Sequence, residues 1–287
     1  MSGYSALFKI FRMKKILLAF NGSHYSDAAL SFAEELNERD PILLVGAFLP
    51  QIDYANLLSY WGGGASGPLY VPILQDESSD AIKENINRFE SFCLKNDIEF
   101  RVHKDFADFA IPELKKETRF ADLLIISDQI FYDQKTSKGP DEYLKEVLSG
   151  VECAVIVIPE KFNFPVSNIL AYDGSASSVY AIRQFAYLFP ELADNQTILI
   201  YASEKEVKEL PDEVNIEELA ARHFSDLVLT KVKADPKTFF TDWMHQKNDC
   251  ILVTGAYGRS DFSRWFRKSF ITDIIKEHQL PLFIAHR

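Results

Sequence analysis

The chain has 287 residues, which is enough for two domains of ordinary size or one large one. Its 47% hydrophobic and 25% charged residues are typical of a globular protein. A net charge of −11 argues against a general binding surface for nucleic acid or an anionic membrane. The three cysteines form no CxxC pair, and no apolar run approaches the roughly 18 residues that a membrane span needs. We therefore expect a cytoplasmic protein with reduced thiols and with neither nucleic acid nor membrane as a partner.

In the first part of the chain, short apolar runs alternate with stretches of helical period. The runs are continuous, as in parallel strands that are buried on both faces. Predicted strands cover 16–20, 42–48, 98–103, 123–126 and 154–158, with helices from Ser26 and over 80–95, 106–118 and 142–149. Residues 50–75, which include three consecutive glycines, predict a long loop that covers a ligand, contacts a partner or packs on the protein. The sequence leaves open whether Met1 or Met13 is the true start.

The same alternation then occurs a second time. Predicted strands cover 169–172, 198–201, 227–232, 251–254 and 282–285, and predicted helices cover 179–189, 213–223, 236–246 and 270–278. Residues 204–218 are acidic and are expected to be a solvated loop and helix face. Alternating strands and helices predict an α/β fold with a mainly parallel sheet in each half.

An internal duplication explains the second series. Leu170 follows Leu18 by 152 positions, and the Gly-Ser pairs after these two runs keep that spacing. The run at Cys250 follows the run at Leu123 by 127 positions, and this second spacing continues to the last strand. The repeat predicts two domains, 14–160 and 165–287.

The stretch 251–269 has the pattern of a phosphate-binding segment. An apolar run ends at two glycines, a basic segment follows, and a serine opens a helical stretch. Backbone N–H groups in a glycine turn and at a helix start, together with positive charge, favour binding of a phosphate. The residues in question are Gly255, Gly258, Arg259, Lys268 and Ser269.

These motifs resemble those of the universal stress proteins. The Asp-Gly-Ser turn after residues 169–172 and the Gly-x-x-Gly after 251–254 match the nucleotide-binding signature of that family. So does the pair that follows Gly258 after nine residues, in which the signature has glycine and then a hydroxyl residue. The resemblance covers both halves, so the chain is similar to two fused universal stress protein domains. It implies two doubly wound five-stranded sheets, each in the order 3-2-1-4-5 with helices on both faces.

The resemblance also implies a ligand, ATP or a related adenine nucleotide, in the second half. By their positions in the family motif, Asp173 and Gly174 would lie near the base and ribose of the nucleotide, as would Tyr201 and Ala202. Gly255, Gly258 and Ser269 would hold the phosphates, with Arg259 and Lys268 supplying charge. Lys268 stands where the signature has glycine, so the sequence does not decide whether ATP is bound.

The first half departs further from the signature. At the spacing of 127, the counterparts of Gly255, Gly258, Lys268 and Ser269 are Asp128, Phe131, Asp141 and Glu142, and Asn21 stands for Asp173. Carboxylates at this place would repel a phosphate. We expect no nucleotide phosphate in the first half.

The sequence contains no recognisable catalytic constellation. The six histidines do not cluster, and no HExxH or Cys/His metal spacing occurs. The leading interpretation is a stress-response binding or regulatory protein whose two halves form an intrachain pseudo-dimer. The alternative is a module of the same fold that binds no nucleotide and acts through protein–protein contacts. Slow ATP hydrolysis, the stress signal, the partner and a further homodimer are not decided by the sequence.

Overall fold

A computed structural model of the chain describes residues 13–21, 25–49, 76–103, 110–128, 150–206, 208–235, 249–255 and 280–285, together with Phe239, Trp243 and Lys247. The predicted loop 50–75 and the predicted helices 142–149 and 270–278 lie outside these residues. So does most of the predicted helix 236–246.

The first five strands form a parallel set in the predicted order. The strands are β1 (Lys14–Asn21), β2 (Ile42–Leu49), β3 (Glu99–His103), β4 (Leu123–Ser127) and β5 (Ala154–Ile158). Their order is β3-β2-β1-β4-β5, and all four neighbouring pairs are parallel. Continuous apolar sequence gives strands such as β4 and β5 that are buried at every position.

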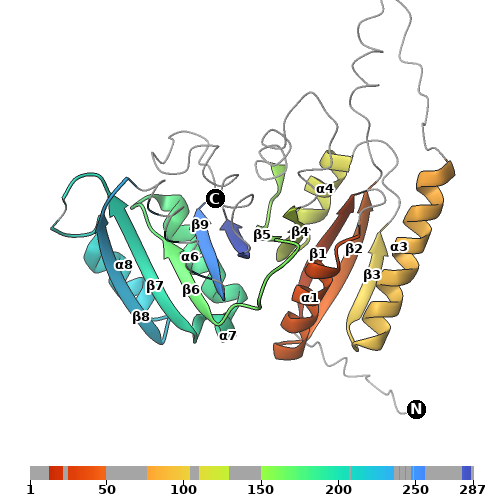
Figure 1. Ribbon diagram of the computed structural model, residues 1–287, viewed down its shortest axis with the longest axis horizontal. Helices are drawn as coiled ribbons and strands as arrows, with labels where there is room; N and C mark the ends of the chain where they lie inside the picture. Colours follow the sequence, from red (N-terminus) through yellow and green to blue (C-terminus); the bar gives the residue numbers. More distant parts are fainter. Residues whose placement is uncertain are drawn as a thin grey trace, which may run out of the picture.

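The last five strands repeat this arrangement. They are β6 (Ser167–Ala171), β7 (Gln196–Ser203), β8 (Asp226–Lys233), β9 (Cys250–Gly255) and β10 (Leu282–Ala285), in the order β8-β7-β6-β9-β10. β10 also pairs with β5, and this pair is antiparallel. One ten-stranded sheet therefore runs through both halves, which meet in Figure 1 at β5 and the dark-blue β10 beside β9. The predicted fold class is confirmed.

Helices cover both faces of the sheet. They are α1 (Asp27–Arg39), α3 (Asp76–Lys95), α4 (Ala110–Thr118), α6 (Ala176–Leu188), α7 (Pro190–Ala193) and α8 (Glu213–Ala221). One buried apolar cluster joins the sheet to α1, α3, α6, α7 and α8, and a second joins the other face to α4, Phe239 and Trp243. The short α7, which begins at a proline, was not predicted from the sequence.

The segment between the halves packs against α1. The rings of Phe162 and Phe164 lie 5.7 and 5.2 Å, centroid to centroid, from the ring of Phe32, which is fully buried. The Arg39 guanidinium lies 4.0 Å from the centroid of the Phe164 ring. The connection between the halves is therefore held by aromatic packing as well as by the β5–β10 pair.

Strand pairing corrects the spacing predicted for the fourth strands. Ile16 pairs with Leu123, and Asn168, 152 positions after Ile16, pairs with Ile251. Ile251 follows Leu123 by 128 positions, not 127. Leu123 and Ile251 also share one apolar cluster, whereas Cys250 belongs to the cluster on the opposite face. A shift of one residue exchanges the two faces of a strand, which a pattern of all-apolar residues cannot reveal.

The correction changes one assignment in the first half. With a spacing of 128, the counterpart of Gly255 is Ser127, not Asp128. The spacing of 127 does hold for the last strands, because Leu124 pairs with Val155 and Leu252 pairs with Leu282.

Candidate functional site

The candidate site lies at the carboxyl ends of β6 and β9. β6 pairs with β7 on one side and with β9 on the other, so the strand order reverses at this point. Ligands of open α/β sheets bind at such a point, beyond the carboxyl ends of the strands. In Figure 1 the two strands lie side by side, with α6 packed beside them.

A tight turn fixes Asp173 at the end of β6. Its Oδ1 accepts a hydrogen bond of 2.9 Å from the Ser175 amide, which closes an Asx turn. Gly174 between them has φ +79°, a conformation that glycine adopts without strain. Ser175 then caps α6, because its Oγ accepts a 3.1 Å hydrogen bond from the Ser178 amide. The Asp-Gly-Ser sequence thus orients one carboxylate and starts one helix.

Gly255 ends β9 directly against the start of α6. A Cβ at this position would lie 2.5 Å from the Ser177 carbonyl carbon and 2.6 Å from the Ser178 amide nitrogen. Real Cβ atoms do not approach backbone this closely, so glycine is required here by packing within the protein. The same close approach brings the end of β9 to the first turn of the helix, where free backbone N–H groups lie.

Tyr201 and Ala202 occupy the end of β7 but point to opposite faces. Ala202 is fully buried in the cluster on the α4 side. The half-buried Tyr201 packs against the other cluster, with its ring centroid 6.5 Å from that of Tyr172. Because both side chains contribute to the two cores, a ligand here would meet the backbone at the end of β7.

A feature that sequence reasoning missed is the segment 208–212, which packs on the Asp173 turn. The Tyr172 hydroxyl donates a 2.6 Å hydrogen bond to the Pro211 carbonyl. A Cβ at Gly174 would lie 2.7 Å from the Pro211 Cβ. Leu210 is only 4% exposed, so the prediction that this acidic stretch is a solvated surface is wrong here. The Leu-Pro pair within the charged run is the sequence signal from which this packing could have been recognised.

This end of β6 carries negative charge. Burial, together with the nearby carboxylates of Asp212 and Asp173, raises the pKa of Tyr172 to about 12. Tyr172 is therefore a hydrogen-bond donor at any physiological pH. The two carboxylates favour hydroxyl or amino groups of a ligand over its phosphates.

The other predicted site residues lie outside the described part of the chain: Gly258, Arg259, Lys268 and Ser269 in the second half, and Phe131, Asp141 and Glu142 in the first. The structure thus brings Asp173, Gly174 and Gly255 to one edge of the sheet. It does not test the phosphate side of the predicted site.

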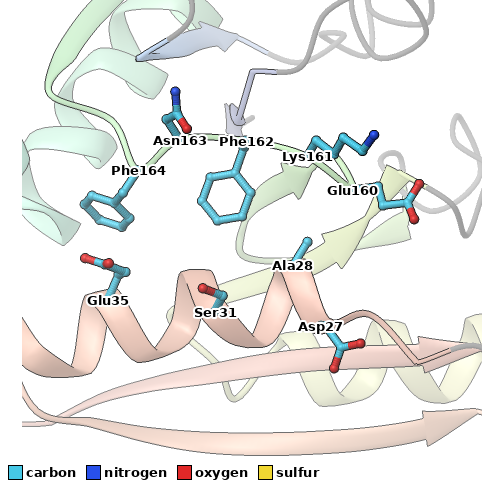
Figure 2. Close-up of a pocket in the computed structure, with 9 residues that line it drawn as sticks. All are labelled: Asp27, Ala28, Ser31, Glu35, Glu160, Lys161, Phe162, Asn163 and Phe164. Carbon is cyan, nitrogen blue, oxygen red and sulfur yellow. The ribbon is translucent and has the colours of Figure 1, made fainter.

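A second concave region lies between α1 and the connecting segment. This groove of about 800 Å³ is lined by residues of both, including Asp27, Ser31, Glu35, Phe162 and Phe164 (Figure 2). Figure 2 shows the two phenylalanine rings directed toward the helix. Asp27 and Glu35 form ion pairs with Arg88 and Arg39, at 3.2 and 2.7 Å. Two of its carboxylates are thus neutralised by the chain itself.

Within the described ranges, no group of three or more His, Cys, Asp or Glu side chains is arranged to hold a metal ion. Likewise, none of the helices that the structure describes is both long and apolar enough to cross a bilayer.

Comparison with known proteins identifies the fold. No family model matches the chain, and no curated protein matches it by sequence. Among solved structures, a universal stress protein from Archaeoglobus fulgidus matches with a TM-score of 0.69 and 16% identity over 96% of both chains.

Two structures from Pseudomonas aeruginosa match more weakly. A protein assigned to the universal stress proteins has a TM-score of 0.54 at 9% identity, and a protein of unknown function has 0.55 at 10%. Each match covers 96% of this chain and 94% or 93% of the other. From its strand order and from these matches, the chain has the universal stress protein fold over nearly its whole length.

Proposed function

We propose that the second half of this protein binds an adenine nucleotide, ATP or a close relative, at the crevice between β6 and β9. The observation that carries the proposal is the Asp173 carboxylate, which the Asx turn holds at the carboxyl end of β6 beside the end of β9. In dinucleotide-binding doubly wound folds, a carboxylate at this same edge of the sheet, after the second strand, accepts a hydrogen bond from a ribose hydroxyl.

The two ends of the nucleotide would meet different environments. The base and ribose would lie toward Asp173, Gly174 and the end of β7 at Tyr201 and Ala202. The phosphates would lie toward Gly255, where β9 meets the first turn of α6. Gly258, Arg259, Lys268 and Ser269 would complete the phosphate side, with the Lys268 ammonium in place of a signature glycine.

In this proposal the first half, 14–160, supports the second, 165–287, and binds no nucleotide. The two halves act as a pseudo-dimer in a cytoplasmic binding or regulatory protein of the stress response. The position of Gly255 is taken by Ser127 in the first half, and Asp128 adds a carboxylate next to it.

Calorimetric titration with ATP tests the proposal. Wild-type protein is expected to release heat on binding, and Gly258→Asp is expected to abolish it, because a carboxylate would stand where a phosphate docks. Asn87→Asp, which adds the same charge on the exposed face of α3, should bind as wild type does. Small molecules released from denatured protein should include the nucleotide. Absence of both heat and released nucleotide would refute the proposal.

One observation favours a second function, that of an interaction module without nucleotide. Both described signature glycines have packing reasons within the protein: Pro211 lies against Gly174, and the backbone of α6 lies against Gly255. Such glycines would be needed even if no ligand were bound. The same titration separates the two functions.

A further inference from the structure

The segment 208–212, here called the strap, crosses the end of β6 and is fastened at several points. At its start, the Lys231 ammonium on β8 donates a 2.6 Å hydrogen bond to the Lys208 carbonyl. In its middle, the Leu210 side chain is buried in the apolar cluster and its amide donates to the Glu213 carboxylate. At its end lies the Tyr172–Pro211 hydrogen bond of 2.6 Å.

The strap occupies one side of the Asp173 turn. Pro211 lies against the Cα of Gly174 so closely that even a methyl group there would reach within 2.7 Å of its Cβ and 3.1 Å of its Cγ. That side of Gly174 is therefore filled by the protein itself. A ligand that approaches the turn from this side has to displace Pro211.

The Tyr172 hydroxyl is suited to control this contact. Tyr172 is 1% exposed and directly follows β6, so its position is set by the sheet and not by the strap. Within the described part of the chain, its hydroxyl makes one hydrogen bond, and that bond goes to the strap. The other two hydrogen bonds of the strap involve β8 and the start of α8, which follows the strap in the chain.

We propose that the strap is an autoinhibitory element, which covers the Gly174 side of the candidate site when the Tyr172 hydroxyl holds Pro211 and admits a nucleotide when Pro211 is released. The ligand part of this inference rests on the proposed function. The latch itself, Tyr172 on Pro211, is a property of the protein without ligand.

Tyr172→Phe tests the latch because it removes the hydroxyl and keeps the buried ring. Loss of one neutral hydrogen bond should increase the open population about fivefold. Hydrogen–deuterium exchange of the amides in 208–212 should therefore be about fivefold faster in the full-length variant. The apparent Kd for ATP should fall by up to the same factor, because affinity scales with the competent fraction.

Two further variants separate this effect from a general one. Tyr187→Phe makes the same chemical change at an exposed position on α6 and should alter neither exchange nor affinity. Gly174→Ala should release the strap by a different route, because its methyl group collides with Pro211, and should also speed exchange in 208–212.

Each result decides one part of the inference. Unchanged exchange in Tyr172→Phe would overturn the latch. Faster exchange with unchanged or weaker ATP binding would overturn autoinhibition. If neither wild type nor Tyr172→Phe binds ATP while exchange is faster, the nucleotide function is refuted, autoinhibition fails with it, and the latch stands.

Discussion

The two halves share a strand order but differ in how the first strand passes to the first helix. In the second half Ser175, the cap of α6, lies four positions after Ala171, the end of β6. In the first half Ser26, the cap of α1, lies seven positions after Ala19, the counterpart of Ala171 at the spacing of 152. The caps are 149 positions apart and the strands 152, so the first-half turn is longer by three residues. The serine that caps α1 is therefore not the counterpart of Ser175, the serine of the Asp-Gly-Ser turn.

The ends of the fourth strands differ in a matching way. Gly255 permits α6 to start in direct backbone contact with β9. Ser127, its counterpart, has a Cβ, so the start of α1 cannot approach β4 as closely. The second half thus has a close contact between a strand end and a helix start that the residue at the corresponding position of the first half does not permit.

The largest expected effect concerns the packing of α1 on the connecting segment. Phe32 on α1 is fully buried against Phe162 and Phe164, whereas the residue 149 positions later, Ala181, is small. Phe32→Ala should lower the free energy of unfolding by about 3–5 kcal/mol. Chemical denaturation measures it, with Phe120→Ala at an exposed position as the control. A loss below about 1 kcal/mol would show that α1 does not secure the connecting segment.

The next effect sharpens the difference between the fourth strands. Gly255→Ala should cost about 2–3 kcal/mol, because its methyl group meets backbone atoms that cannot rotate away. Gly150→Ala is the control, since a Cβ there has no atom within 4 Å. Equal unfolding curves for the two variants would contradict the tight contact between β9 and α6.

A smaller effect tests the two strand ends as ligand sites. Under the proposed function, Asp173→Asn keeps the Oδ1 acceptor of the turn but removes the charge, so ATP affinity should fall about tenfold. Asn21→Asp, the reciprocal change at the end of β1, should create no second binding event. Calorimetric titration measures the affinity for ATP and the number of ATP molecules bound per chain in both variants. Two equivalent sites in either protein would contradict the asymmetry.

The smallest effect is a pH dependence confined to the first half. Arg119, directly after α4, forms two hydrogen bonds, of 2.8 and 2.9 Å, with the Glu152 carboxylate before β5. These bonds lower the pKa of Glu152, so the pair stabilises the fold above the pKa of the unfolded carboxyl and is lost as pH falls through the lower folded value. Arg119→Gln should return the pKa of Glu152 toward its ordinary value in a carbon-13 NMR titration. Because both groups are solvent-exposed, added salt should weaken the shift.

Sequence reasoning predicted the sheet well because its signals are local. Continuous apolar runs such as those of β4 and β9 define buried parallel strands, and serine residues at 26 and 175 mark helix starts. Asp173, Gly174 and Gly255 lie at one edge of the sheet, as the strand order implied by the resemblance to universal stress proteins predicts.

The features that were not predicted from the sequence depend on contacts between distant segments. The one-residue error at β4 arose because four of its five residues are apolar and all five are buried, so the two faces do not differ in the sequence. The strap was missed because Leu210 and Pro211 lie within a charged run, and their partners, Tyr172 and Gly174, lie far earlier in the chain. The packing that requires glycine at position 255 could be found only from the position of α6.

The place of β10 has a consequence for folding during synthesis. The strand nearest the C-terminus completes the middle of the sheet, between β5 and β9. Until it arrives, β5 is an unpaired apolar edge on a first half that has already been made. The β10 strand of another chain fits that edge as well as its own does. Crowded synthesis should therefore favour dimers that have exchanged their last strands, and dilution before folding should prevent them.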